Sequence, residues 1–227
     1  PLILVGPIVL CQDDIRGVSL VCSEIAAISL QAILGGRSEP EPGVGHLWAE
    51  RIARFALLGA TLTTRHPSFP YVVCELETFR GCPRRQNCAF CSEGKKQVRY
   101  QRPVADVVAE VEALAGQGNR YYRLGCQSDL FLYGARPRAG QLYPEPAVIQ
   151  ELYQGIRRVA PDLKVLHMDN ANPATIMRDP KAAEAIIETI CRYNTPGDVA
   201  AFGLESADPV VLAANRVETS PEETLQA

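Results

Sequence analysis

The chain has 227 residues, of which 47% are hydrophobic and 22% charged, and its net charge at pH 7 is −3. This composition excludes a disordered, collagen-like or low-complexity chain and is typical of a soluble globular protein. At about 100–200 residues per domain, the length allows one large domain or one domain with a small appendage.

The longest runs without a charged residue, 1–12 and 25–36, have twelve residues each. A membrane-spanning helix needs ~20 apolar residues, so neither run is long enough. No basic segment leads into an apolar core and a small-residue cleavage site, so no secretory signal is read either. We therefore expect no membrane segment and a cytoplasmic location.

Residues 1–68 are predicted to form a small N-terminal α/β region of uncertain role. The run 1–10 is apolar and β-prone, and 18–34 has apolar residues at helical spacing. A linker rich in proline and glycine, 37–45, precedes a second predicted helix at 46–58.

From Phe69 onward, predicted strands alternate with predicted helices. The strands are 71–76, 121–124, 164–168 and 199–204, and the helices are 104–114, 148–159 and 180–193. This order predicts an α/β fold with a parallel sheet, open or curled into a barrel, over residues 69–227. Polar residues follow each predicted strand, at 81–91, 125–129, 169–172 and 203–206. Because loops after parallel strands converge on one edge of the sheet, we expect a common site there.

Three of the eight cysteines share a C-x5-C-x2-C array: Cys82, Cys88 and Cys91. Thiolate sulfur favours zinc, copper(I) or an iron–sulfur cluster over hard cations. A structural zinc site would need Cys74, Cys126 or His66 as a fourth ligand. A [4Fe–4S] cluster held by three cysteines leaves one iron open to another ligand. The array indicates a cluster first, zinc second, and a loop without metal third. Cys11, Cys22 and Cys191 are predicted to be buried.

The run GCPRRQNCAFCSEG, residues 81–94, resembles the cluster loop of the radical S-adenosylmethionine superfamily, in which an aromatic residue precedes the last of three cysteines. The runs YRLGCQSDLF and AFGLESADPVVL are most similar to the subgroup that ends in a helix-hairpin-helix domain. The resemblance covers residues 66–227. The first cysteine gap is five residues here, whereas three is commonest in the superfamily.

The resemblance implies that Cys82, Cys88 and Cys91 ligate a [4Fe–4S] cluster whose open iron binds S-adenosylmethionine. It implies five further cofactor contacts. Phe90 lies beside the adenine, Gln127 and Asp129 lie near the methionine amino group, and Glu205 and Ser206 reach the ribose or methionine moiety. Cys126 and Gln127 replace a Gly-Glu pair that is common in the family.

Some of these residues also have local interpretations. Glu205 and Ser206 suit a helix N-terminus ahead of Pro209, and 169–172 suits a turn before Pro173 as well as a substrate or ribose contact. The three histidines, His46, His66 and His167, are predicted to be structural, because none stands at catalytic spacing from a carboxylate.

The implied chemistry is reductive cleavage of S-adenosylmethionine to methionine and a 5′-deoxyadenosyl radical, which abstracts hydrogen from a substrate that the sequence does not identify. The implied fold is a partial (β/α) barrel of six strand–helix units. A helix start at Ser220, with Pro221 and Glu223, follows the fourth predicted strand. We therefore expect a fragment of a longer protein, truncated after the fourth unit.

Seven basic residues and one acidic residue between Phe79 and Arg102 give that segment a charge of +6. Such a segment suits an anionic substrate, an acidic, low-potential electron donor of the flavodoxin or ferredoxin type, a solvated loop, or, more weakly, nucleic acid. The alternative function is a non-enzymatic zinc-binding module that contacts nucleic acid or protein through this loop.

Overall fold

The computed structural model describes residues 3–4, 20–21, 44–96 and 99–227. Its central feature is a parallel sheet in the order β3 (Val73–Glu77), β6 (Tyr121–Gly125) and β9 (Val165–Met168). A shorter parallel pair, β10 (Asn170–Ala171) and β11 (Ala201–Phe202), follows β9. The protein is therefore mixed α/β with parallel strands, as the alternation of elements predicts.

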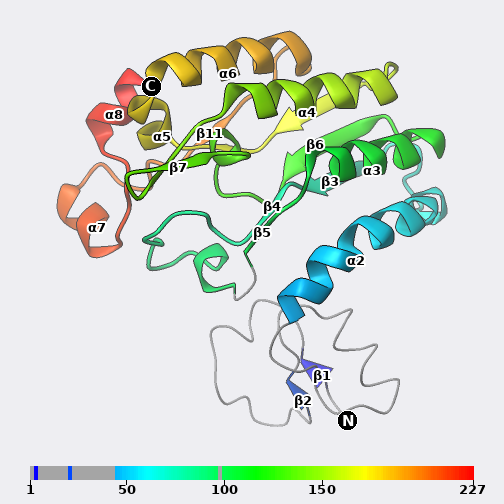
Figure 1. Ribbon diagram of the computed structural model, residues 1–227, viewed down its shortest axis with the longest axis horizontal. Coiled ribbons are helices and arrows are strands. Elements are labelled where there is room, and N and C mark those ends of the chain that lie inside the picture. Colours follow the sequence, from blue (N-terminus) through cyan, green and yellow to red (C-terminus); the bar gives the residue numbers. More distant parts are fainter. Residues whose placement is uncertain (1–2, 5–19, 22–43, 97–98) are drawn as a thin grey trace.

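Three long helices cover one face of this sheet. Helices α3 (Val104–Gly116), α4 (Pro146–Val159) and α6 (Pro180–Tyr193) lie side by side along it (Figure 1). Strand residues such as Leu76, Leu124 and Leu166 are fully buried in the resulting core. Since side chains alternate along a strand, the intervening residues point to the other face of the sheet.

The remaining elements are mostly short. They are β1 (Ile3–Leu4), β2 (Leu20–Val21), α2 (Val44–Gly59), the 3₁₀ helix η2 (Ala60–Arg65), β4 (Phe79–Arg80), η3 (Glu93–Lys95), β5 (Tyr100–Gln101), η4 (Leu130–Leu132), β7 (Arg136–Arg138), β8 (Gln141–Tyr143), α5 (Pro173–Arg178), α7 (Pro209–Ala214) and α8 (Pro221–Gln226). Helix α2 packs on α3, and α8 packs on α5. Within the described ranges, no helix has both the length and the apolar character needed to cross a membrane.

Helices α5, α6, α7 and α8 begin in the same way. Each has a side-chain N-cap followed by a proline, the caps being Asn172, Asp179, Asp208 and Ser220. The cap oxygen accepts a backbone N–H that the helix leaves unpaired, and proline lacks an N–H at a position that needs none. Ser220 and Glu223 form the predicted capping box.

Two sequence-based predictions need correction. The helix predicted at 18–34 is wrong at Leu20 and Val21, which form β2 and pair in parallel with β1. The rest of that segment, including Cys22, lies outside the described residues, and so does Cys11. Apolar spacing over a short run does not separate a helix from a strand. Cys191, predicted to be buried, is exposed on α6.

Candidate functional site

The three predicted metal ligands come from an irregular loop between β4 and η3. The loop leaves β4 through Gly81, whose φ of 80° lies in the left-handed region that favours glycine. Cys82 is buried, whereas Cys88 and Cys91 are partly exposed. The chain thus turns at Gly81, directly before the first of the three cysteines.

All three cysteines line one pocket of about 190 Å³. Residues that follow β6 and β11, together with β10, complete its wall. These include Gln127, Ser128, Asn170 and Glu205. The structure therefore brings the cysteine loop together with the ends of three strands, as the predicted convergence of strand ends requires.

The thiols are close neighbours but do not form a finished metal site. Among the residues that the structure describes, no three His, Cys, Asp or Glu side chains are placed to hold a metal ion. Burial raises the pKa of the Cys88 thiol, with the Arg84 charge opposing and Cys91 and Cys82 adding to the effect. Cys82 and Cys91 thus lie near enough to Cys88 to disfavour a negative charge on its sulfur.

Three buried polar atoms on residues of the pocket wall have no hydrogen-bond partner. They are Arg84 Nε, Asn87 Oδ1 and Ser128 Oγ. Buried polar atoms are normally satisfied, so this set of a donor, an acceptor and a hydroxyl suits a polar ligand. Together with three cysteine sulfurs, the wall fits an iron–sulfur cluster and a polar group bound next to it.

A second cavity, of about 270 Å³, adjoins the first and shares Phe90 and Glu205 with it. Phe90 is 57% exposed, and apolar residues of α7 extend the wall of this cavity. Ser206 lines the second cavity only. Glu205 has a φ of 66°, a strained conformation for a residue with a side chain, and such strain is concentrated at functional sites.

Gln127 and Asp129 are held by the protein itself. Gln127 Oε1 accepts from Thr78 Oγ1 at 2.7 Å, and its Nε2 donates to the Leu124 carbonyl at 3.0 Å. Asp129 lines neither cavity. It is buried and caps η4, with Oδ1 accepting the Phe131 N–H at 3.1 Å.

The polar residues after β9 have two different environments, one on the sheet and one in the pocket wall. Asp169 forms an ion pair on the sheet, whereas Asn170 and Asn172 line the pocket. The Asn172 side chain also accepts the Ala174 N–H at 2.9 Å and so caps α5. The local interpretation of Asn172, as a turn residue before Pro173, is thus confirmed.

The three candidates for a fourth zinc ligand lie outside the pocket wall. Cys74 is part of the hydrophobic core. Cys126 donates to Glu75 Oε1 at 3.5 Å, and His66 Nδ1 accepts the Ser68 N–H at 3.1 Å. A closed four-ligand zinc site with one of these residues would require a rearrangement of the structure.

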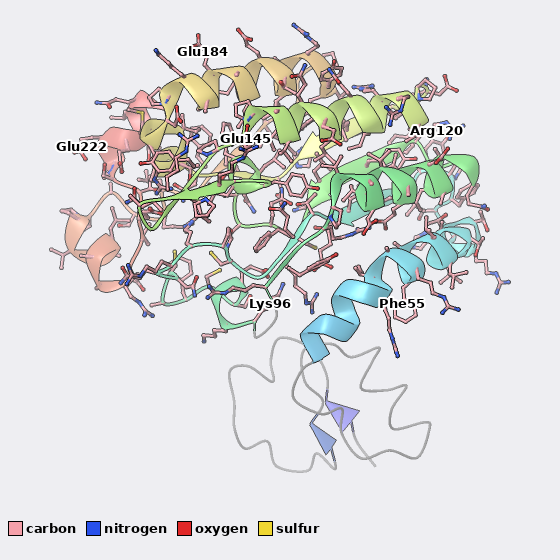
Figure 2. The ribbon with its side chains drawn as sticks, viewed as in Figure 1. Phe55, Lys96, Arg120, Glu145, Glu184 and Glu222 are labelled. Carbon is pink, nitrogen blue, oxygen red and sulfur yellow. The ribbon has the colours of Figure 1, made fainter. Side chains whose placement is uncertain are left out.

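Carboxylates partner much of the basic segment around the cysteine loop. The pairs are Arg80 with Glu77, Arg84 with Glu218, Lys96 (Figure 2) with Glu93, and Arg102 with Glu110. Arg102 is only 2% exposed, so its charge stabilises the folded chain and is not available to bind a partner at the surface. These pairs engage four of the segment's seven basic residues, and the three carboxylates from outside the segment offset at most half of its charge of +6.

Sequence reasoning missed residues 215–219, which fasten the cysteine loop. The Asn215 carbonyl accepts the Ala89 N–H at 2.9 Å. The Glu218 carboxylate joins Arg84 of the loop to Arg178 of α5. No sequence signal marks these contacts, because the partners are 40 or more residues apart.

Sequence reasoning also missed a charged row on the face of the sheet away from the helices. Glu75, Arg123 and His167 lie opposite one another in register. Arg123 donates to Asp169 Oδ2 at 2.7 Å, and His167 Nδ1 contacts Asp198. His167 therefore does have a carboxylate partner, which the chain supplies 31 residues away.

Comparisons with known proteins give relatives without an assigned activity. No family model matches the chain. An uncharacterized protein of Methanocaldococcus jannaschii is 39% identical over 183 residues, which are 78% of this chain and 34% of that protein. An uncharacterized protein of Archaeoglobus fulgidus is 38% identical over 225 residues, or 98% of this chain and 41% of that protein. The chain thus spans well under half the length of these relatives.

Among solved structures, the chain is similar to the cobalamin-dependent S-adenosylmethionine radical enzyme OxsB with aqua-cobalamin and S-adenosylmethionine bound. The sequence identity is 18% and the TM-score 0.47, over 66% of this chain and 21% of that one. The structure of OxsB with aqua-cobalamin alone gives a TM-score of 0.46. At this level the likeness is too slight to establish a shared activity.

Proposed function

We propose that this chain is the cluster-binding part of a radical S-adenosylmethionine enzyme, with its sheet forming part of a partial barrel. In this proposal Cys82, Cys88 and Cys91 hold a [4Fe–4S] cluster, and S-adenosylmethionine occupies the adjoining space. When bound, the cluster supplies one electron that splits the sulfonium carbon–sulfur bond of the cofactor and yields a 5′-deoxyadenosyl radical.

One observation carries the proposal. Among the residues that the structure describes, three cysteines and no fourth line a pocket at the carboxyl ends of parallel strands. Three thiolate ligands leave one iron of a four-iron cluster open. The unpaired atoms of Arg84, Asn87 and Ser128 in the same wall suit the charged amino-acid end of a bound cofactor.

The lining of the second cavity supports the proposal that this cavity holds the adenosine part of S-adenosylmethionine. Its wall combines the Phe90 ring with α7 residues Val211 and Leu212, and an aromatic ring beside aliphatic side chains suits a planar adenine. Glu205 lies between the two cavities, where its carboxylate can accept from a ribose hydroxyl. In this arrangement Gln127 can reach the cofactor through the second lone pair of Oε1 or the second N–H of Nε2. Asp129 supports the pocket by accepting the N–H of Asn172, a residue of its wall.

We place the substrate on the open face of the sheet. The row of Glu75, Arg123 and His167 crosses this face. Asp169, the partner of Arg123, directly precedes Asn170, which lines the pocket. The chemical identity of the substrate is left open. For the electron, we propose an acidic low-potential donor that docks at the cysteine loop, where Arg85 is exposed.

Anaerobic reconstitution with iron and sulfide tests the proposal. We expect a broad absorption band at about 400 nm from thiolate-ligated iron, and we expect about four iron atoms per chain. The Cys88→Ala variant should lose most of the absorption band and most of the bound iron. Cys191→Ala is the matched control, since Cys191 is exposed on α6 and lies outside the pocket wall, and it should load like the unmodified chain.

The loaded chain should also cleave S-adenosylmethionine when dithionite is added. Stoichiometric tetrahedral zinc without cluster uptake would instead support the zinc-binding module. A chain that binds neither iron nor zinc at these cysteines would rule out both functions.

A further inference from the structure

Arg84 brings a positive charge to the cysteine pocket. It is the one basic residue among the described residues that line this pocket, and it follows Cys82 by two positions. Its side chain is only 14% exposed. A charge so little exposed to water is poorly screened, so it acts on neighbouring groups more strongly than a surface charge does.

The surrounding carboxylates cancel this charge only in part, although buried Asp129 also lies near enough to interact with it. Glu218 lies 3.8 Å from Arg84 Nε but also forms the closer ion pair with Arg178, so one carboxylate serves two guanidinium groups. Glu93 of the pocket wall is engaged by Lys96. Glu205 is exposed, and water screens its charge.

The position of Arg84 is defined by contacts on both sides of the loop. Glu218 ties its side chain to α5 through Arg178, and the Ala89 N–H ties the same loop to the Asn215 carbonyl. Arg84 Nε lies 3.8 Å from Glu218 and has no hydrogen-bond partner, so the guanidinium is held there by charge and not by a hydrogen bond at Nε.

We propose that Arg84 is the pocket's counter-charge for the metal group that its three cysteines bind, and that it stabilises the reduced form of that group. This inference rests on the proposed function. Reduction adds one electron from dithionite or a low-potential donor to the oxidised cluster, [4Fe–4S]²⁺, and gives [4Fe–4S]⁺, with no bond broken and no proton taken up. The added negative charge is favoured by a fixed positive charge nearby, so Arg84 raises the reduction potential.

The test is a redox titration of the reconstituted chain by optical and electron paramagnetic resonance spectroscopy, without S-adenosylmethionine. For Arg84→Gln we expect about a tenfold shift of the equilibrium towards the oxidised cluster at a given potential, equivalent to ~59 mV for a one-electron couple. Arg84→Lys keeps the charge and should recover most of this shift. Arg85→Gln is the matched control, because Arg85 is exposed on the same loop and lies outside the pocket wall.

Each outcome decides the inference. Equal potentials for Arg84→Gln and Arg85→Gln would overturn it, and so would equal shifts for Arg84→Gln and Arg84→Lys. If Arg84→Gln takes up no cluster but Arg84→Lys does, the result supports a role for the positive charge. If neither variant takes up a cluster, the shape of the arginine side chain matters and not its charge, and the inference is overturned. If the unmodified chain takes up no cluster, the proposed function itself fails and this inference falls with it.

Discussion

Burial changes the pKa of Asp129, a residue that the sequence presents as a cofactor ligand. Its side chain is 2% exposed. Burial raises its pKa from 3.8 to about 6, against the opposing effects of the Arg84 charge and the N–H groups of Phe131 and Asn172. Desolvation outweighs these favourable contacts, because a buried carboxylate loses the water that stabilises its charge.

The raised pKa of Asp129 predicts a pH-dependent stability. The folded chain holds the proton more tightly than the unfolded chain, so this contribution is fully present below about pH 4 and is lost as the pH rises through about 6. The loss is about 3 kcal/mol at neutral pH. Asp129→Asn keeps an oxygen for the cap and removes the titration.

Urea unfolding of both proteins at several pH values between 4 and 7 measures this effect. We expect the stability of the unmodified chain to fall relative to that of Asp129→Asn as the pH rises. Stability curves that run parallel over this range would contradict the assignment.

At the scale of elements, the cysteine loop depends on a segment more than 100 residues further along the chain. The loop has little regular structure of its own, and residues 215–219 hold it through the Ala89 N–H and the Arg84 side chain. Such a loop is stable only as far as these few contacts keep it in place.

We predict that Glu218→Gln loosens the cysteine loop. Loss of a half-exposed charge shared by Arg84 and Arg178 should cost about 1 kcal/mol, which corresponds to about fivefold faster hydrogen exchange at the Ala89 N–H. Glu222→Gln, an exposed change on α8 (Figure 2), is the control and should leave this exchange unchanged. Equal exchange rates in the two variants would show that the ion pairs do not hold the loop.

At the scale of the whole molecule, the distribution of charge differs from what the sequence suggests. The chain as a whole is acidic, with a net charge of −3. Ion pairs within the protein engage four of the seven basic residues of the segment 79–102, including Arg102 with Glu110 at 2.6 Å. Less positive surface then remains for a polyanion than the sequence suggests.

We therefore predict that this chain binds nucleic acid only weakly. Fluorescence anisotropy with labelled single-stranded DNA and with tRNA at about 0.15 M salt should give a dissociation constant of about 10⁻⁴ M or weaker, at the weak end of non-specific binding. Sub-micromolar binding that falls steeply with salt, and that is lost in an Arg84→Ala and Arg85→Ala double variant, would contradict this prediction.

Much of the fold follows from local patterns in the sequence. The helix predicted at 180–193 has the same bounds as α6, and the strand predicted at 121–124 is one residue shorter than β6. Apolar periodicity and N-cap residues act over a few neighbouring positions, so they can be read without knowledge of the fold. The fourth predicted strand is longer than β11, because the length of a strand depends on its partner, β10.

Some features of the candidate site likewise follow from the sequence, whereas others depend on the tertiary structure. The sequence by itself determined the cysteine spacing and the convergence of the strand ends, since both follow from residue order and from the geometry of parallel sheets. Only the tertiary structure decided that Gln127 is already hydrogen-bonded, that Asp129 is buried, that Glu218 braces Arg84 and that His167 contacts Asp198. These properties depend on contacts between residues far apart in the chain, and no local pattern encodes which distant side chain will lie next to a given residue.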